Sequence, residues 1–157
     1  MTATAAEQSV QTLEIKVEQM IAAPIEVVFQ AVLDDLGPQG QMPGGKPFPM
    51  TLEPWPGGRW FRDLGNNAGH FWGHVQVIKP PTLLELCGPM PMSYPAINHV
   101  QYRLTKEVDG TLLKIVHTAM GLIIPEHRDG MPEGWKFGLR RIRELAEQRH
   151  SGVGLTR

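Results

Sequence analysis

"LEIKVEQMIAAPIEVVFQAVLDDL", residues 13–36, decides how the fold begins. Residues 13–18 alternate between apolar and charged side chains, which is the period of a β-strand that buries one face. Pro24 then suits the first position of a helix, and the apolar residues after it recur at helical spacing. The stretch therefore predicts a strand followed at once by a short amphipathic helix over residues 24–36.

A loop and a series of short strands follow the helix. Residues 37–50 hold four glycines and four prolines, too many for a regular element, so they are predicted to form a long loop. Strand-like segments separated by turn-forming residues then read "TLEPW", "RWFRDL", "GHFWGHVQVI", "TLLELCG", "AINHVQYRLTKEV" and "TLLKIVHTAM". This order predicts an antiparallel meander.

The chain closes with a second amphipathic pattern, "PEGWKFGLRRIRELAEQRH", residues 132–150. It carries one apolar stripe over several helical turns, formed by Trp135, Leu139, Ile142 and Ala146. A long helix must bury such a stripe, and the sheet is the large partner that the sequence offers. The chain is thus predicted to be one α+β domain over residues 13–150, with flexible tails at 1–12 and 151–157.

The composition excludes several classes of function. Fifteen Lys and Arg against sixteen Asp and Glu leave a net charge of −1, without the positive surface that nucleic acid or an anionic membrane requires. No basic leader with an apolar core precedes the domain, and no stretch approaches the roughly 20 apolar residues of a membrane span. We therefore expect a cytoplasmic protein without a cofactor. The single cysteine, Cys87, is expected to be a buried, inert thiol.

"RDLGNNAGHFWGH", residues 62–74, predicts the first hairpin of the binding face. A turn centred on residues 66–67 pairs Arg62 with Phe71 and Trp60 with Gly73. The inward face then carries Trp60, Arg62, Phe71 and Val75.

His70 and His74 raise the question of a metal site in the same hairpin. Four residues of strand separate them by about 13 Å, whereas two ligands of one zinc ion must each lie about 2 Å from it. They cannot bind one ion together, so no metal is expected.

A second hairpin supplies the other half of the concave face. With Asp109 and Gly110 as the turn, Tyr102 falls opposite His117. The inward residues are then Asn98, Val100, Tyr102, Leu104, Leu113, Ile115 and His117. In the "GPMPMSYP" segment, Met90 and Met92 could form an adaptable lid or could simply fill the core.

The alternation of the first hairpin also predicts an assembly. If Trp60 and Phe71 point inward, Phe61 and Trp72 point outward as neighbouring aromatics. Such a patch predicts a homodimer through the convex face, unless the N-terminal tail or the Pro-rich loop covers it.

Five sequence segments resemble the START-like, or SRPBCC, superfamily, in the branch named after the activator of the heat-shock protein 90 ATPase. They are "APIEVVFQAVLD", "EPWPGGRW", "GHVQVIKPPTLLEL", "TLLKIVHTAMG" and "GWKFGLRRIRELAE". The resemblance implies a helix-grip fold, in which a curved antiparallel sheet wraps the C-terminal helix and leaves a cavity for a small ligand. The loop at 37–50 departs from the family by its many prolines and glycines and by lacking a tryptophan after the first helix.

The leading hypothesis is a protein that binds a small hydrophobic or amphipathic molecule between sheet and helix. The ligand-binding residues are predicted to be Trp60, Arg62, Phe71, Asn98, Tyr102, His117, Trp135 and Leu139. One alternative is an enzyme of cyclase or hydrolase type, with His117 as general base and Tyr102 or Arg62 as polarising group. The other alternative is a co-chaperone-like module that binds a protein.

Overall fold

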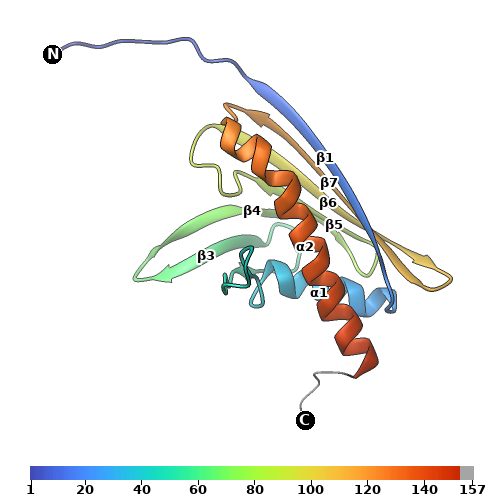
Figure 1. The fold of residues 1–157 in the computed structure, drawn as a ribbon. Coiled ribbons are helices and arrows are strands. Elements are labelled where there is room, and N and C mark those ends of the chain that lie inside the picture. Colours follow the sequence, from blue (N-terminus) through green and yellow to red (C-terminus); the bar gives the residue numbers. More distant parts are fainter. Residues whose placement is uncertain (153–157) are drawn as a thin grey trace.

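A seven-stranded antiparallel sheet forms the frame of the molecule in the computed structural model, which describes residues 1–152. The strands run in the order β1-β7-β6-β5-β4-β3-β2 across the sheet (Figure 1). Their bounds are β1 Gln11–Ile21, β2 Thr51–Leu52, β3 Arg59–Gly65, β4 Ala68–Lys79, β5 Leu83–Gly88, β6 Ala96–Glu107 and β7 Gly110–Gly121. The first and last strands in the sequence, β1 and β7, pair with each other at one edge of the sheet.

Two helices cover the concave side of this sheet. The short helix α1 (Ile25–Leu36) follows β1, and the long helix α2 (Pro125–Ser151) crosses the sheet face and packs against α1 (Figure 1). The buried residues of α2 are Leu139, Ile142, Leu145 and Ala146, so the predicted apolar stripe does face the core. The α+β helix-grip architecture expected from the sequence is therefore confirmed.

Helix α2 begins seven residues earlier than the sequence pattern predicted. Pro125 takes the first turn, where its missing N–H costs nothing, and Pro132 lies inside the helix. A proline inside a helix removes one backbone hydrogen bond but need not end it when the flanking turns are held. The prediction was wrong in treating Pro132 as the helix start.

The elements at the two ends of the described chain have the following bounds. Residues 1–10 are exposed and carry no helix or strand, and β1 begins at Gln11. Of the predicted C-terminal tail, Ser151 ends α2 and Gly152 caps it, while residues 153–157 lie outside the described residues.

The β6–β7 hairpin keeps the predicted faces although its register differs. Tyr102 pairs with Ile115 rather than with His117, which pairs with Val100. The turn uses Val108 and Asp109, so every pair shifts by two residues, and a shift of two leaves each side chain on the same face. The expected inward set was therefore right for this hairpin.

The β3–β4 hairpin contains two bulges that the sequence pattern did not predict. Asn66 and Asn67 form the turn with positive φ values of 54° and 60°, as predicted. Leu64 is then an extra residue on β3, and Trp72 is an extra residue on β4. Between these two bulges the register is displaced by one residue, and beyond Trp72 it returns to the predicted pairing.

This displacement reverses two expected orientations. Phe71 pairs with Phe61 and is 45% exposed, so the prediction that it faces the cavity was wrong. Trp72 was expected to point outward, but it is half-buried and packs against Trp60. The outward aromatic pair is Phe61 and Phe71, with the guanidinium of Arg59 lying 4.8 Å from the Phe61 ring. The homodimer stays a prediction, and the aromatic pair that could carry it is Phe61 and Phe71.

Candidate functional site

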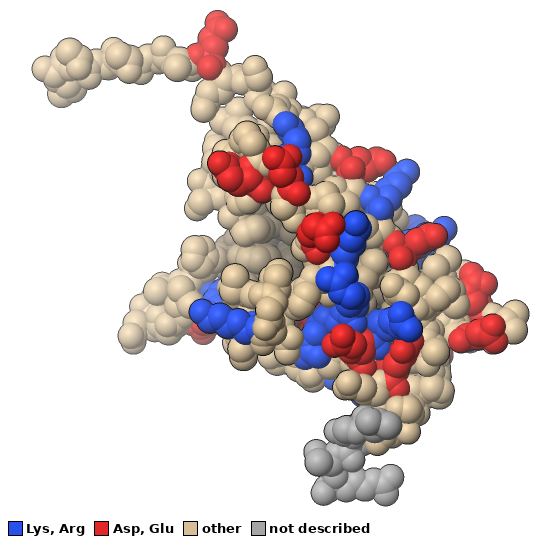
Figure 2. Space-filling model, in the orientation of Figure 1, with Lys and Arg blue, Asp and Glu red and all other residues tan. Residues whose placement is uncertain are grey.

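A cavity of about 190 Å³ lies between the concave face of the sheet and the two helices. Figure 2 shows the hollow on this face of the molecule, with a floor free of the colours of charged residues. It is bordered by the end of α1, the loop at 37–50, strands β3, β4, β6 and β7, the β5–β6 loop and the middle of α2. The lining residues are Asp35, Leu36, Gly40, Gln41, Pro43, Phe48, Met50, Trp60, Trp72, Met90, Tyr102, Ile115, Gly134, Trp135, Phe137, Gly138 and Ile142.

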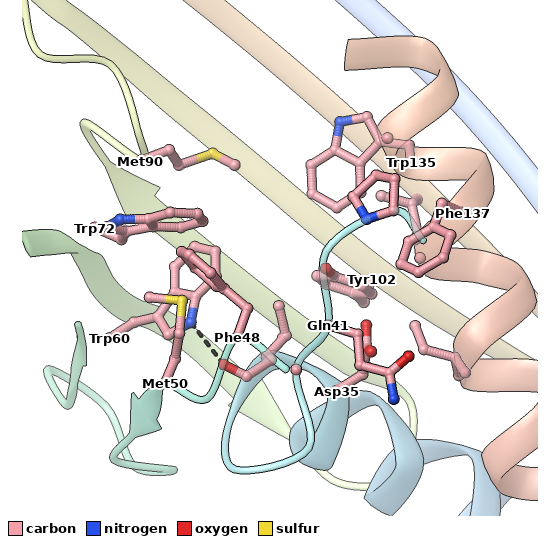
Figure 3. Close-up of a pocket in the computed structure, with 17 residues that line it drawn as sticks. Asp35, Gln41, Phe48, Met50, Trp60, Trp72, Met90, Tyr102, Trp135 and Phe137 are labelled. Atoms are coloured by element: carbon pink, nitrogen blue, oxygen red, sulfur yellow. Dashed lines mark hydrogen bonds between the residues drawn. The ribbon is translucent and has the colours of Figure 1, made fainter. Parts of the chain in front are cut away.

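Three aromatic rings build one wall (Figure 3). The ring centroids of Trp60 and Trp72 lie 5.1 Å apart in an edge-to-face arrangement, and those of Phe48 and Trp72 lie 5.8 Å apart. Trp60 is buried, and its indole Nε1 donates a hydrogen bond of 2.8 Å to the carbonyl oxygen of Leu36 at the end of α1. The indole is thereby fixed between sheet and helix, so this wall is rigid before any ligand arrives.

The loop at 37–50 closes the cavity on the side of α1. The backbone N–H of Phe48 donates to the carbonyl of Gly40 at 2.8 Å, and that of Met50 donates to Gly37 at 2.9 Å. A Cβ at Gly40 would lie 2.5 Å from the carbonyl oxygen of Phe48, so only glycine allows this close approach. Glycine at position 40 thus allows the loop to fold compactly over the cavity, where Phe48 and Met50 become part of the lining.

Helix α2 forms the opposite wall of the cavity, with large aromatic side chains at some positions and glycines at others. The Trp135 and Tyr102 rings meet edge to face at 6.2 Å between centroids. Gly134 and Gly138 also border the cavity, and a Cβ added at either would meet nothing within 4 Å. Empty space therefore lies directly beside the helix backbone.

Two polar side chains stand at one end of this apolar cavity. Figure 3 shows the carboxyl group of Asp35 beside Gln41, below the ring of Tyr102. Burial raises the pKa of Asp35 to about 7, although the guanidinium of Arg141 on α2 acts to lower it. Asp35 has no hydrogen-bond or ion-pair partner among the described residues.

The phenol of Tyr102 faces the same end of the cavity. Its side chain is 2% exposed, and burial together with the nearby Asp35 charge raises its pKa well above the usual range. Tyr102 therefore stays protonated and can act as a neutral hydrogen-bond donor or acceptor toward the cavity.

A chain of hydrogen bonds lies behind the cavity wall. The indole Nε1 of Trp135 donates to Nδ1 of His117 at 2.9 Å, and Nε2 of His117 lies 2.6 Å from Oδ1 of Asn98. The amide of Asn98 in turn donates to the carbonyls of Gly88 and Pro89. Burial lowers the pKa of His117 to about 4, so its imidazole is neutral at pH 7. Both ring nitrogens are thus occupied within the protein, and neither is free to take a proton from a ligand.

The eight residues predicted to bind a ligand therefore lie in different parts of the structure. Trp60, Tyr102 and Trp135 line the cavity, whereas Asn98 and His117 lie behind it and Leu139 packs in the core. Arg62 shares the inward side of β3 with Trp60, but its guanidinium lies 3.8 Å from the Phe48 ring centroid, outside the cavity lining. Phe71 faces away, as described above. The guanidinium of Arg62 thus makes a cation–π contact with Phe48 that stabilises the loop at 37–50.

The most prominent residue that the sequence pattern did not reveal is Asp35. It follows Asp34 at the end of an amphipathic helix, where two carboxylates normally indicate an exposed face. No periodicity separates the carboxylate that faces the cavity from the one that pairs with Arg149 on α2.

The two methionines of the β5–β6 loop differ in position, so one lies in the cavity wall and the other in the core. Met90 lines the cavity, and its N–H donates to the carbonyl of Trp72. Met92 is 3% exposed and its sulfur accepts a hydrogen bond from Asn98. One therefore forms part of the cavity wall, and the other fills the core.

Within residues 1–152, no three His, Cys, Asp or Glu side chains gather closely enough to hold a metal ion. Neither described helix is long and apolar enough to cross a membrane.

No protein-family model and no curated protein sequence matches the chain. Solved structures do match it in fold. An uncharacterized protein from Rhizobium leguminosarum superposes with a TM-score of 0.72 at 16% identity, over 91% of this chain and 99% of that one. A protein from Chromobacterium violaceum gives 0.66 at 20% identity, over 85% and 96% of the two chains.

A third structure is the di-domain aromatase/cyclase StfQ from the steffimycin biosynthetic pathway. It superposes with a TM-score of 0.64 at 13% identity, over 90% of this chain and 52% of that one. At these identities the likeness concerns the fold alone, and it is consistent with the helix-grip architecture.

Proposed function

We propose that this chain is a START-like protein that binds a small hydrophobic or amphipathic molecule in the cavity between sheet and α2. The observation that carries the proposal is the cavity itself, whose walls are aromatic and aliphatic and whose polar groups stand together at one end. Apolar walls supply affinity, and a few fixed polar groups orient the ligand. The fold shared with an aromatase/cyclase supports the same class of function.

The volume limits the size of the ligand. Drug-sized molecules fill pockets of about 300 to 1,000 Å³, whereas an engineered apolar cavity of about 150 Å³ binds benzene. A cavity of about 190 Å³ suits a molecule with one aromatic ring and a short substituent. A larger ligand would require the loop at 37–50 to move.

The glycines of α2 support the view that the space is kept open. Glycine inside a helix costs about 1 kcal/mol relative to alanine. At Gly134 and Gly138 no neighbouring atom excludes a side chain, so packing within the protein does not explain the glycines. Because Gly134 and Gly138 border the cavity, a side chain at either would enter the space proposed for the ligand. Gly130 on the same helix has equally open surroundings but does not border the cavity.

Native mass spectrometry of freshly purified protein tests for a copurifying molecule, and calorimetric titration with indole and 2-phenylethanol tests the cavity directly. We expect saturable binding of one molecule per chain. Gly138→Leu should abolish it by filling the cavity.

Gly130→Leu is the matched control, because Gly130 lies on the same helix but outside the lining, with open space around it. It should bind as the parent protein does. If no molecule copurifies and neither probe binds, or if both leucine variants bind equally well, the proposal is overturned.

A further inference from the structure

The polar end of the cavity points to a ligand class, an inference that rests on the proposed function. We propose that the ligand is a small apolar molecule bearing a protonated amine, and that Asp35 is its counter-ion. The carboxyl group stands at the polar end of the cavity, without a partner of its own among the described residues.

The contrast with the preceding residue shows that this carboxyl is not merely part of an acidic helix end. Asp34 forms an ion pair of 2.7 Å with Arg149 and accepts a hydrogen bond of 3.0 Å from Gln30. Asp35 has neither kind of contact within the described part of the chain. Of two consecutive carboxylates, the protein satisfies one and leaves the other facing the cavity.

The surroundings of Asp35 favour a cation over other ligand groups. Burial raises the pKa of its carboxyl to about 7, because the surrounding protein does not offset the cost of removing the ionised carboxylate from water. Tyr102 on β6 faces it as a neutral phenol. Arg141 on α2 acts on it only at a distance, beyond ion-pair contact, and the Nε of that guanidinium is itself buried without a partner among residues 1–152. An ammonium group in the cavity would supply the missing charge at contact distance.

The aromatic lining strengthens this preference. The rings of Tyr102, Trp135 and Phe137 border the same part of the cavity (Figure 3). Aromatic faces attract cations, and they do so more strongly where water is excluded. An amine placed near Asp35 would meet both a carboxylate and aromatic rings.

An anionic ligand lacks any comparable partner. No Lys or Arg belongs to the cavity lining formed by the described residues. Arg62 lies over Phe48 and is not part of the cavity lining, although its Nη1 is buried without a hydrogen-bond partner among the described residues. A ligand carboxylate would meet Asp35 and no compensating cation.

Three probes of similar shape test the proposal: 2-phenylethylamine, 2-phenylethanol and phenylacetate. Calorimetric titration at about pH 8, where Asp35 and the amine are both charged, should show the amine binding at least about tenfold more tightly than the alcohol. Phenylacetate should bind most weakly. Asp35→Asn should remove the preference for the amine, and Asp34→Asn, the matched control, should keep it.

Proton release gives a second readout that needs no variant. A bound cation lowers the pKa of a neighbouring carboxyl, so amine binding near pH 7 should release protons from the protein. The observed enthalpy should then depend on the buffer for the amine but not for the alcohol.

The possible failures are distinguishable. Equal affinity for amine and alcohol, or a preference that survives in Asp35→Asn, overturns the amine proposal, while the binding of the alcohol upholds the proposed function. Binding of none of the three probes overturns both.

Discussion

The indole Nε1 of Trp135 donates a hydrogen bond of 2.9 Å to Nδ1 of His117, and this contact fixes the protonation state of the imidazole. Because Nδ1 accepts, the proton of the neutral ring lies on Nε2, which donates to Oδ1 of Asn98. Helix α2 is thereby joined through β7 and β6 to the β5–β6 loop, which carries Met90. The cavity wall and the buried hydrogen-bond chain behind it depend on each other.

Trp135→Phe should destabilise the protein by about 1 to 3 kcal/mol, because it keeps an aromatic ring but leaves Nδ1 of the buried His117 without a donor. Trp135→Ala should cost more, about 3 to 4 kcal/mol, because it also removes the ring; the loss should stay in the lower part of the range for a fully buried tryptophan because this indole is half-buried. Urea unfolding measures both. Trp55→Phe, at an indole that is 55% exposed, is the control and should change little. Equal losses at the two tryptophans would refute the structural role of the hydrogen bond.

His117 should make the protein less stable in acid. Its pKa is lowered from 6.5 to about 4 in the folded state, so between these values the unfolded chain binds a proton that the folded chain does not. The free energy of unfolding should therefore fall as the pH falls from about 6.5 to about 4, with a slope that approaches about 1.4 kcal/mol per pH unit. The difference between the parent protein and His117→Gln, measured at several pH values, isolates this contribution. A difference independent of pH would contradict the low pKa.

Asp35 should act with the opposite sign. Its pKa is raised from 3.8 to about 7, so the folded state holds a proton that the unfolded state loses, and stability falls as the pH rises through this range. Asp35→Asn should gain on the order of 3 kcal/mol over the parent protein at pH 8 and little at pH 4. Chemical unfolding at both pH values checks the gain. Asp34→Asn should show no such gain, because it removes an existing ion pair with Arg149.

The helix glycines should be replaceable by alanine with a gain in stability. Gly134→Ala and Gly138→Ala each place a methyl group where nothing lies within 4 Å, so the higher helix propensity of alanine should add about 0.5 to 1 kcal/mol. Thermal unfolding of the unliganded protein measures the gain. Gly130→Ala should stabilise equally, because it shares the helix but not the cavity. A loss at Gly138 alone would mean that the cavity closes around the helix when it is empty.

The sequence determined the elements and their order. The alternation in β1 and the helical spacing in α1 and α2 are local periodicities, and the turns between the strands are marked by local turn-forming residues. These signals depend on residues close together in the sequence, so they can be recognised without knowledge of the rest of the fold. It also determined the faces of β6 and β7, because an error of two residues in register leaves inward side chains inward. Tyr102 and His117 were therefore placed on the correct side of the sheet although they do not pair.

The identity of the residues that line the cavity depends on packing between distant segments of the chain. Leu64 and Trp72 are inserted as bulges, and because one extra residue reverses the alternation, Trp72 turns inward and Phe71 outward. Asp35 faces the cavity rather than the solvent because the loop at 37–50 folds over the end of α1, which no local pattern encodes. Periodicity reports which side of an element is apolar, whereas the burial of one particular carboxyl depends on segments distant in sequence that pack around it.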